Sequence, residues 1–314
     1  MEHGGFRLTR AAMADQPWGF LVLDKPAGLT SHACVSRVRR AYGLRRVGHG
    51  GTLDPAVTGV LPIAVGSATR LLPYLSGDKT YRGTVQLGLT TSSDDLQGEV
   101  LERRSVPKLD AAALNRALEG FRGAIEQVPP QVSAVHVDGE RAYRRARRGE
   151  TLELAARPVL IQRLELLGWN PADGRVELEV ACSAGTYIRA LARDLGAALG
   201  CGGVLASLRR TAALGFSLEQ AVPLEALEQR PPPPLLEPLA ALGPLPRQQL
   251  SPAQLDGWRC GRRLSAATPA AAAAGQLSEG QAVVVVTPDG NLAGMARVTA
   301  DGQLQPKLVL EAAG

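Results

Sequence analysis

Lysine is nearly absent from this chain of 314 residues: 31 of the 35 basic residues are arginine, and lysine occurs only at positions 25, 79, 108 and 307. Because arginine makes bidentate contacts with phosphate and stacks on bases, this bias suits a nucleic-acid partner. A genome rich in G and C also favours arginine and alanine codons, so the formal net charge of +5 is weak support by itself. Aromatic residues make up only 4% of the chain, which leaves the core to aliphatic side chains.

Cysteine is also sparse, and the four residues (Cys34, Cys182, Cys201 and Cys260) include no CxxC pair and no histidine at zinc-ligand spacing. We therefore expect no metal site, and buried free thiols in a reducing compartment. The chain contains no glycine-rich dinucleotide fingerprint, so no cofactor is expected. No apolar run approaches the roughly 20 residues that cross a bilayer, and the N-terminus has no basic start before an apolar core. We expect a cytoplasmic protein without a membrane partner.

The length suggests about two domains, and an apolar fraction of 45% is typical of a globular protein. We expect a loose tail over residues 1–17, a main domain over 18–229, a Pro-rich semi-rigid connector over 230–247 and a small β module over 248–314. Apolar runs and alternation predict strands over residues 18–24, 81–90, 159–167, 175–182, 282–287, 292–298 and 305–310. Capping residues and apolar periodicity predict helices from Thr30 or Ser31 to Gly43, after Asp110, over 186–200 and over 252–263, with a low-complexity loop over 266–275.

A glycine-rich stretch, VGHGGTLDPAVTGVLPIAVG over residues 47–66, stands at the centre of the chain. His49 and Asp54 lie inside it, and the apolar run that follows is typical of a buried segment. Reactive groups often lie on loops anchored to a rigid scaffold. An Asp-Pro pair among glycines is nevertheless most often a plain turn, so the pattern alone leaves both interpretations open.

Two groups of arginines and one single arginine, Arg189, are candidates for binding anions, and each has its own alternative interpretation. Five of them, interrupted by Tyr143 and with no acid between them, occupy an arginine-rich segment, namely Arg141, Arg144, Arg145, Arg147 and Arg148. A solvated helix face is the alternative, but basic residues around an aromatic favour binding of RNA phosphates and an unpaired base. A second group, over residues 37–46, is equally consistent with a solvated helix end and a phosphate-binding patch. Arg189 falls in the first turn of a predicted helix, which is unfavourable unless a carboxylate or phosphate lies opposite.

Five sequence motifs follow one another along the chain in this order: LVLDKPAGLTS, GHGGTLDPAVTGVLP, DKTYRGTVQLG, CSAGTYIRALARDLG and LRRT. Together they resemble the bacterial TruB family of tRNA pseudouridine synthases, which make pseudouridine in the T-loop of tRNA. The resemblance covers roughly Gly19 to Glu219, and the C-terminal module resembles, more loosely, the family's PUA-type RNA-binding domain. It implies an α+β pseudouridine-synthase fold: a mixed, largely antiparallel sheet with a central cleft and flanking helices, plus the small β domain.

The resemblance assigns catalytic roles to three residues. Asp54, in GTLDP, matches the nucleophilic aspartate of the family. Tyr81 matches a tyrosine that stacks on the target base and is a candidate for the final proton removal. Arg189, in GTYIR, matches the arginine that pairs with the catalytic carboxylate, which would also explain a cation in the first helical turn.

The resemblance also implies residues that bind substrate. His49 matches a contact of the flipped-out nucleotide, Tyr187 a substrate-contacting tyrosine and Leu208 a pocket-lining leucine. Lys25 matches the lysine of the DKPxGxTS stretch, where structural support is expected. Two departures, Gly50 for a common threonine and Ala56-Val57 for the usual Leu-Ala, keep the residues small or apolar.

The implied reaction is isomerisation of uridine, with the carboxylate attacking C1′ or the uracil ring or removing a ribose proton to give a glycal. The implied partner is the T-stem and T-loop of tRNA, gripped by residues 127–153; protein partners stay unknown. A second hypothesis is a non-catalytic tRNA-binding or folding protein in which Asp54 is only a turn residue. A third is a guide-RNA-dependent synthase, which a built-in tRNA clamp at 127–153 disfavours.

Overall fold

The computed structural model describes residues 17–265 and 277–310, apart from 134, 138 and 147. The predicted tail up to residue 16, Arg147 and the predicted loop over 266–275 lie outside the described residues. Among the described residues, no helix has the length and apolar character needed to span a membrane.

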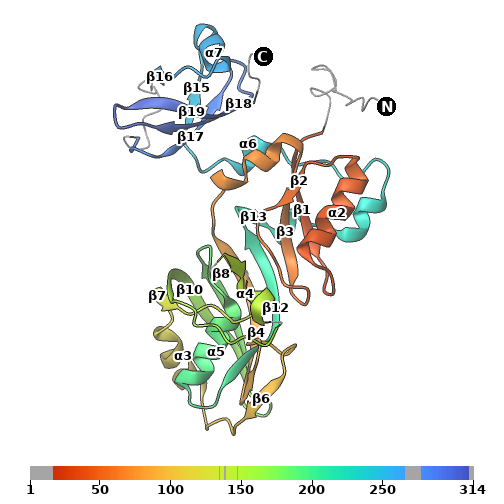
Figure 1. The fold of residues 1–314 in the computed structure, drawn as a ribbon, viewed down its shortest axis with the longest axis vertical. Coiled ribbons are helices and arrows are strands. Elements are labelled where there is room, and N and C mark those ends of the chain that lie inside the picture. The colour runs from red at the N-terminus through yellow and green to blue at the C-terminus, as the bar shows by residue number, and fades with distance from the viewer. Residues whose placement is uncertain (1–16, 134, 138, 147, 266–276, 311–314) are drawn as a thin grey trace.

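One ten-stranded sheet forms the body of the protein (Figure 1). Its strands follow the order β14 (Val222–Pro223), β1 (Gly19–Lys25), β3 (Thr58–Val65), β12 (Gly203–Ala213), β4 (Lys79–Leu87), β11 (Arg175–Cys182), β10 (Arg157–Asn170) and β7 (Gly123–Gln127). The short strands β2 (Val47–His49) and β13 (Phe216–Ser217) pair with β3 and β12. Among the described strand pairs of this sheet, only β1–β14 and β3–β12 are parallel. The expected mixed, largely antiparallel sheet is confirmed.

Three helices flank the sheet where the capping signals predicted them. In α2 (Ser31–Tyr42), Thr30 Oγ1 accepts a hydrogen bond from the Ala33 amide, and Gly43 ends the helix with φ 65°. In α3 (Ala111–Glu119), Asp110 Oδ1 accepts from the Ala113 amide at 2.7 Å. The third helix, α5 (Ile188–Ala198), buries the apolar face that its periodicity predicted.

Shorter elements connect these parts. The predicted strand 81–90 is two strands, because the chain turns at Gly88 (φ 83°) between β4 and β5. The other short elements are β5 (Leu89–Thr91), β6 (Val100–Arg103), β8 (His136–Val137), β9 (Glu140–Arg141), α4 (Ala142–Ala146) and the 3-10 helices η1 (Gly66–Arg70), η2 (Leu72–Tyr74), η3 (Leu218–Gln220) and η4 (Leu224–Glu228).

Strand β12 joins the two halves of the sheet, because it lies between β3 and β4 and extends through both (Figure 1). Arg210 on β12 is the direct partner of Gly59 on one side and of Tyr81 on the other. Gly59 has φ 104°, and a Cβ there would lie 2.1 Å from the Arg210 carbonyl oxygen. Only glycine therefore permits the two strands to approach at this point.

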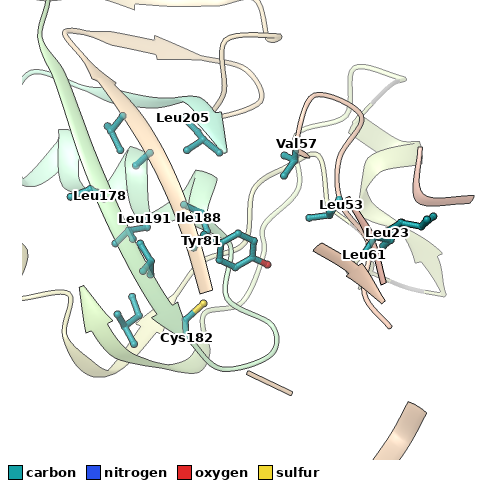
Figure 2. Packing of buried hydrophobic residues seen from close by; sticks show 14 of the residues in the cluster. Leu23, Leu53, Val57, Leu61, Tyr81, Leu178, Cys182, Ile188, Leu191 and Leu205 are labelled. Atoms are coloured by element: carbon teal, nitrogen blue, oxygen red, sulfur yellow. The ribbon is translucent and has the colours of Figure 1, made fainter. Parts of the chain in front are cut away.

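A single apolar cluster runs under this joint (Figure 2). Leu53 and Leu61 enter it from one half, and Tyr81 and Leu178 from the other. The cluster also contains three of the four free thiols, Cys34, Cys182 and Cys201. Cys260 is exposed, so the expectation that all four cysteines are buried is wrong for that residue.

The C-terminal module is a separate five-stranded sheet, as its turn signals predicted. Its order is β15 (Arg247–Gln249), β17 (Ala282–Val286), β18 (Leu292–Val298), β19 (Gln303–Val309) and β16 (Leu264–Ser265). Helix α7 (Pro252–Arg259) packs on it through the buried Trp258, whose ring N–H donates to the Ala293 carbonyl at 3.1 Å. The pattern had not indicated β15 and β16, since both are very short.

The Pro-rich segment is packed rather than a free spacer. Leu236 exchanges two backbone hydrogen bonds with Phe20 of β1, at 2.7 and 3.0 Å. The Tyr42 hydroxyl donates to the Pro233 carbonyl, and after α6 (Pro238–Ala241) the side chain of Leu242 is fully buried. The segment therefore extends the edge of the main sheet before the chain enters the second one.

Candidate active site

A cavity of about 820 Å³ opens at the joint between the two halves of the main sheet. Segments far apart in the chain line it: residues 51–57, Lys79 and Tyr81 of β4, the turn containing Ser93 and Asp95, Arg141 and Tyr143, residues 185–189, and Leu205 and Leu208 of β12. Such a mostly preformed, partly apolar cavity with a few convergent polar groups is typical of a small-ligand or nucleotide site.

Two buried side chains, Lys25 and Ser31, hold the loop that carries Asp54. Lys25 Nζ donates to the carbonyls of Pro26, Pro55 and Val57 at 2.8, 3.1 and 2.7 Å. Ser31 Oγ donates to the Leu53 carbonyl and accepts from the Leu53 amide. The loop is thereby fixed while the Asp54 side chain keeps 48% of its surface exposed.

Lys25 itself is fully buried and does not line the cavity. All three of its N–H donors are used by backbone carbonyls. Burial lowers the pKa of its ammonium group, opposed by the nearby Cys34 and Asp54. This corrects its grouping with the substrate-binding residues, because the side chain supports the loop and cannot reach a ligand.

The position of Arg189 in the first turn of its helix predicted a carboxylate opposite it, and the Asp54 carboxylate lies there. The guanidinium is 3.1 Å from Asp54 Oδ2 and 3.8 Å from Asp95 Oδ2. It also donates to the carbonyls of Ser93 and Val132 at 3.0 and 2.9 Å. With a residue exposure of only 7%, this cation is held in place beside the Asp54 carboxylate.

Asp95 is a cavity residue that the sequence interpretation missed. Its Oδ1 accepts from Ser93 Oγ at 2.6 Å and from the Gln97 amide at 3.0 Å, which leaves Oδ2 facing Arg189. The only signal was the polar turn SSDD over residues 92–95, which looks like an ordinary loop. Its position opposite Arg189 depends on the fold.

Tyr81 lies at the floor of the cavity with 7% of its surface exposed. Its hydroxyl points from β4 toward the loop that carries Leu53 and Val57 (Figure 2). Burial raises the pKa of the Tyr81 phenol, and the charge of Arg210 opposes this shift. The ring thus offers an apolar face and a neutral hydroxyl to the cavity.

Tyr187 and Leu208 also line the cavity. Tyr187 precedes α5, and its backbone is fixed by the buried side chain of Gln127, which accepts from its amide at 2.8 Å and donates to its carbonyl at 3.1 Å. This contact of Gln127, 60 positions away, had no local signal.

His49 is half-buried at the end of β2 and does not line the cavity. Its Nδ1 accepts from the Gly51 amide at 3.2 Å. Burial, and then the charge of Arg210, lower the pKa of the imidazole, so it is neutral at pH 7. Its contact with a flipped-out nucleotide stays a prediction.

The arginine-rich segment differs from its prediction in one respect. Arg148 donates to both oxygens of Glu140 at 2.8 Å, and Arg145 and Arg148 both contact Glu150 at 2.7 and 2.9 Å. No acid lies between Arg141 and Arg148, but Glu140 and Glu150 flank the segment, and its turn brings them back to pair with Arg145 and Arg148. Hydrogen bonds from arginine lower the pKa of Glu140 and Glu150. Arg141 and Tyr143 lie at the cavity, and Arg144 is exposed.

Within the part of the chain that the structure describes, no three histidine, cysteine or acidic side chains gather in a way that could hold a metal ion. The site consists of carboxylates, arginines and a phenol.

Known proteins share this sequence nearly from end to end. Family models match three consecutive regions: TruB family pseudouridylate synthase (N terminal domain) at residues 39–188, tRNA pseudouridylate synthase B C-terminal domain at 189–231, and Pseudouridine synthase II TruB, C-terminal at 246–310. A protein of Parasynechococcus marenigrum (strain WH8102), named tRNA pseudouridine synthase B, is 62% identical over 96% of this chain and all of its own length. A namesake from Synechococcus sp. (strain WH7803) is 59% identical over 95% of this chain and 99% of its own.

The chain belongs to the TruB family. It is therefore a pseudouridylate synthase, an isomerase, and the resemblance noted in the sequence is confirmed. Two solved structures share the TruB fold at a TM-score of 0.67. One is a Cbf5-Nop10-Gar1 complex (24% identity, covering 90% of this chain and 78% of that one), and the other an archaeal box H/ACA sRNP Nop10-Cbf5 complex (23% identity, 94% and 87%). They support the α+β fold class.

Proposed function

We propose that this TruB-family enzyme converts one uridine in the T-loop of tRNA to pseudouridine, with Asp54 attacking the flipped-out nucleotide. The relatives named tRNA pseudouridine synthase B support tRNA as the substrate. The observation that carries the proposal is the placement of Asp54, an accessible carboxylate at a cavity wall, 3.1 Å from a buried guanidinium.

The reaction needs little more than these groups. The N1–C1′ bond breaks, the uracil turns, and C5 bonds to C1′ while its proton leaves. No electron is gained or lost overall, so the chemistry requires no redox cofactor. Attack at C1′, attack on the ring and removal of a ribose proton remain three possible routes, and an ionised Asp54 serves each of them. Arg189, 3.1 Å away, would hold that carboxylate in its orientation.

Tyr81 and its neighbours suit the handling of a single base. A uridine inside a paired or stacked region is unreachable, so it must leave the stack before reaction. The Tyr81 ring would stack on the base at the cavity floor, with Tyr187 and Leu208 at its walls. His49, at the start of the Asp54 loop, is the candidate to occupy the vacated space in the RNA.

The arginine-rich segment is proposed to bind the T-stem. Its Arg141 and Tyr143 border the cavity, so phosphates held there would belong to the nucleotides beside the target. Exposed ion pairs contribute little to stability, and RNA phosphates could therefore replace Glu140 and Glu150 as partners of Arg148. The arginines over 37–46 and the PUA-like C-terminal sheet are further candidate RNA contacts, and we expect the enzyme to act in the cytoplasm without a guide RNA.

The decisive experiment is a single-turnover assay of Asp54→Asn on a T-arm RNA and on complete tRNA. We expect no pseudouridine and unchanged RNA affinity, since the substitution removes the charge and little volume. Asp289→Asn, in an exposed turn of the C-terminal sheet, is the matched control and should be fully active. An active Asp54→Asn enzyme, or a wild type that binds tRNA without forming product, would favour the non-catalytic RNA-binding alternative. Activity only with an added guide RNA would favour the third.

A further inference from the structure

Arg210 is a completely buried cation that the proposed reaction does not yet use. It lies on β12, and its guanidinium donates to the carbonyls of Val60 at 2.7 Å, Gly51 at 3.1 Å and Thr52 at 3.4 Å. Unlike Arg189, it forms no ion pair with a carboxylate among the described residues. Burial of an unpaired charge is costly, and lowers the pKa of this guanidinium, so its presence requires a reason beyond packing.

The hydroxyl of Tyr81 points toward the same loop whose carbonyls accept hydrogen bonds from the Arg210 guanidinium. Tyr81 and Arg210 are direct partners across β4 and β12, where opposite side chains lie close together. A register shift follows Arg210 on β12, and such irregularities re-aim side chains beside active sites.

The same side chain contacts the Asp54 loop. Gly51 and Thr52 immediately precede Leu53 and Asp54, so Arg210 is bonded to the loop that carries the Asp54 carboxylate. On the neighbouring strand it lies opposite Tyr81. Other titratable groups near the Tyr81 hydroxyl are Cys182 and Asp54, both of which disfavour its ionisation. Arg210 is the cation whose charge opposes them.

We propose that Arg210 is the positioning residue that prepares the Tyr81 oxygen to accept the proton from C5 of the rotated uracil. The inference rests on the proposed function and deepens it. The bond between C5 and C1′ has formed before this step begins. The C5–H bond then breaks, and its electron pair restores the C5–C6 double bond. The proton bonds to the Tyr81 oxygen while the phenol passes its own proton to water, and the guanidinium stabilises the negative charge that develops on this oxygen.

The test separates this last step from those before it. One T-arm RNA carries deuterium at C5 of the target uridine, and a second carries 5-fluorouridine, whose C5 has no proton to remove. For Arg210→Lys, we expect pseudouridine formation to fall about 10-fold or more and to acquire a primary deuterium isotope effect. Formation of the rearranged 5-fluoro nucleoside should continue at nearly the wild-type rate. Arg209→Lys is the matched control, since the neighbouring Arg209 points away and pairs with Asp24 at 2.7 Å.

Two outcomes would overturn the inference. If Arg210→Lys slows both RNAs equally and shows no isotope effect, Arg210 only holds the loop. Tyr81→Phe retains the ring and the Arg210 contacts with the loop, and it gives a second test if Arg210→Lys fails to fold. Normal pseudouridine formation by Tyr81→Phe would exclude the hydroxyl as proton acceptor. Failure of the proposed function looks different, because an active Asp54→Asn variant would contradict it whatever Arg210→Lys does.

Discussion

The two buried arginines of the main sheet region, Arg189 and Arg210, and the arginines of the surface segment have the same side chain in opposite environments. Arg189 and Arg210 are buried and donate to backbone carbonyls, whose positions are fixed by the fold. Arg148, by contrast, is exposed and pairs with the side-chain carboxylates of Glu140 and Glu150. The two buried arginines are held in one geometry by these carbonyls, whereas the exposed arginine can exchange partners when an RNA arrives.

This difference in environment predicts a difference in function. Removing a buried guanidinium leaves carbonyls without partners, at about 1–3 kcal/mol for each unsatisfied group, and misplaces the groups that react. Removing an exposed one costs little stability and lowers a long-range attraction that salt screens. The two buried arginines should therefore govern the chemical step, and the arginine-rich segment should govern RNA affinity.

The largest effect is expected for Arg189→Gln. Loss of the cation beside Asp54 should lower the single-turnover rate about 10²- to 10³-fold, as for other preorganised electrostatic contacts, while RNA affinity changes little. The matched control is Arg193→Gln, one turn further along α5, whose partners are Asp94 and Asp194 and which does not line the cavity. Equal losses in the two variants would mean that the cavity position has no special role.

Gly59→Ala should damage the joint that places Arg210. Its Cβ would lie 2.1 Å from the Arg210 carbonyl oxygen in a left-handed backbone conformation, so strain and overpacking should together cost about 3 kcal/mol in the free energy of unfolding. Denaturant titration followed by circular dichroism measures this. Gly290→Ala also has positive φ, 82°, but no atom within 4 Å of its Cβ, and should cost only about 1 kcal/mol. Similar losses would show that strand contact at Gly59 is unimportant.

Simultaneous replacement of Arg144, Arg145, Arg147 and Arg148 by glutamine should weaken tRNA binding more than it slows reaction at saturating tRNA. The slope of log affinity against log salt should become shallower by roughly one for each phosphate that the variant no longer neutralises. Arg163→Gln, an exposed arginine paired with Glu179 on the main sheet, serves as the single-site control and should leave the slope unchanged. An unchanged slope in the fourfold variant would contradict the assignment of the segment to RNA.

The smallest effect concerns the pH dependence of stability. Because the pKa of His49 is lowered in the folded state, the unfolded chain binds a proton first as the pH falls through about 6.5. The wild type should lose stability in that range, and His49→Gln should lose less between pH 8 and pH 5. Thermal unfolding at several pH values measures this, with His136→Gln on the exposed strand β8 as control. Identical pH profiles for wild type and His49→Gln would refute the pKa shift.

Local patterns were sufficient where the physics is local. The caps at Thr30 and Asp110, the glycine stop at Gly43 and the alternation of β11 each depend on residues within a few positions, and the structure has all of them. Even the partner of Arg189 had a local signal, because a cation in the first turn of a helix needs an opposing anion. The identity of that anion came only from the resemblance.

The sequence by itself determined the element types, the α+β class and, through five ordered motifs, the family. Only the tertiary structure decided that Asp95 shares Arg189, that Gln127 fixes Tyr187, that Glu140 and Glu150 neutralise part of the arginine-rich segment, and that Arg210 lies opposite Tyr81 on the neighbouring strand. Secondary structure follows from neighbours along the chain, whereas the environment of a charged side chain depends on strands that meet only after folding. For that reason two adjacent arginines, Arg209 and Arg210, look alike in the sequence and occupy the surface and the centre of the molecule.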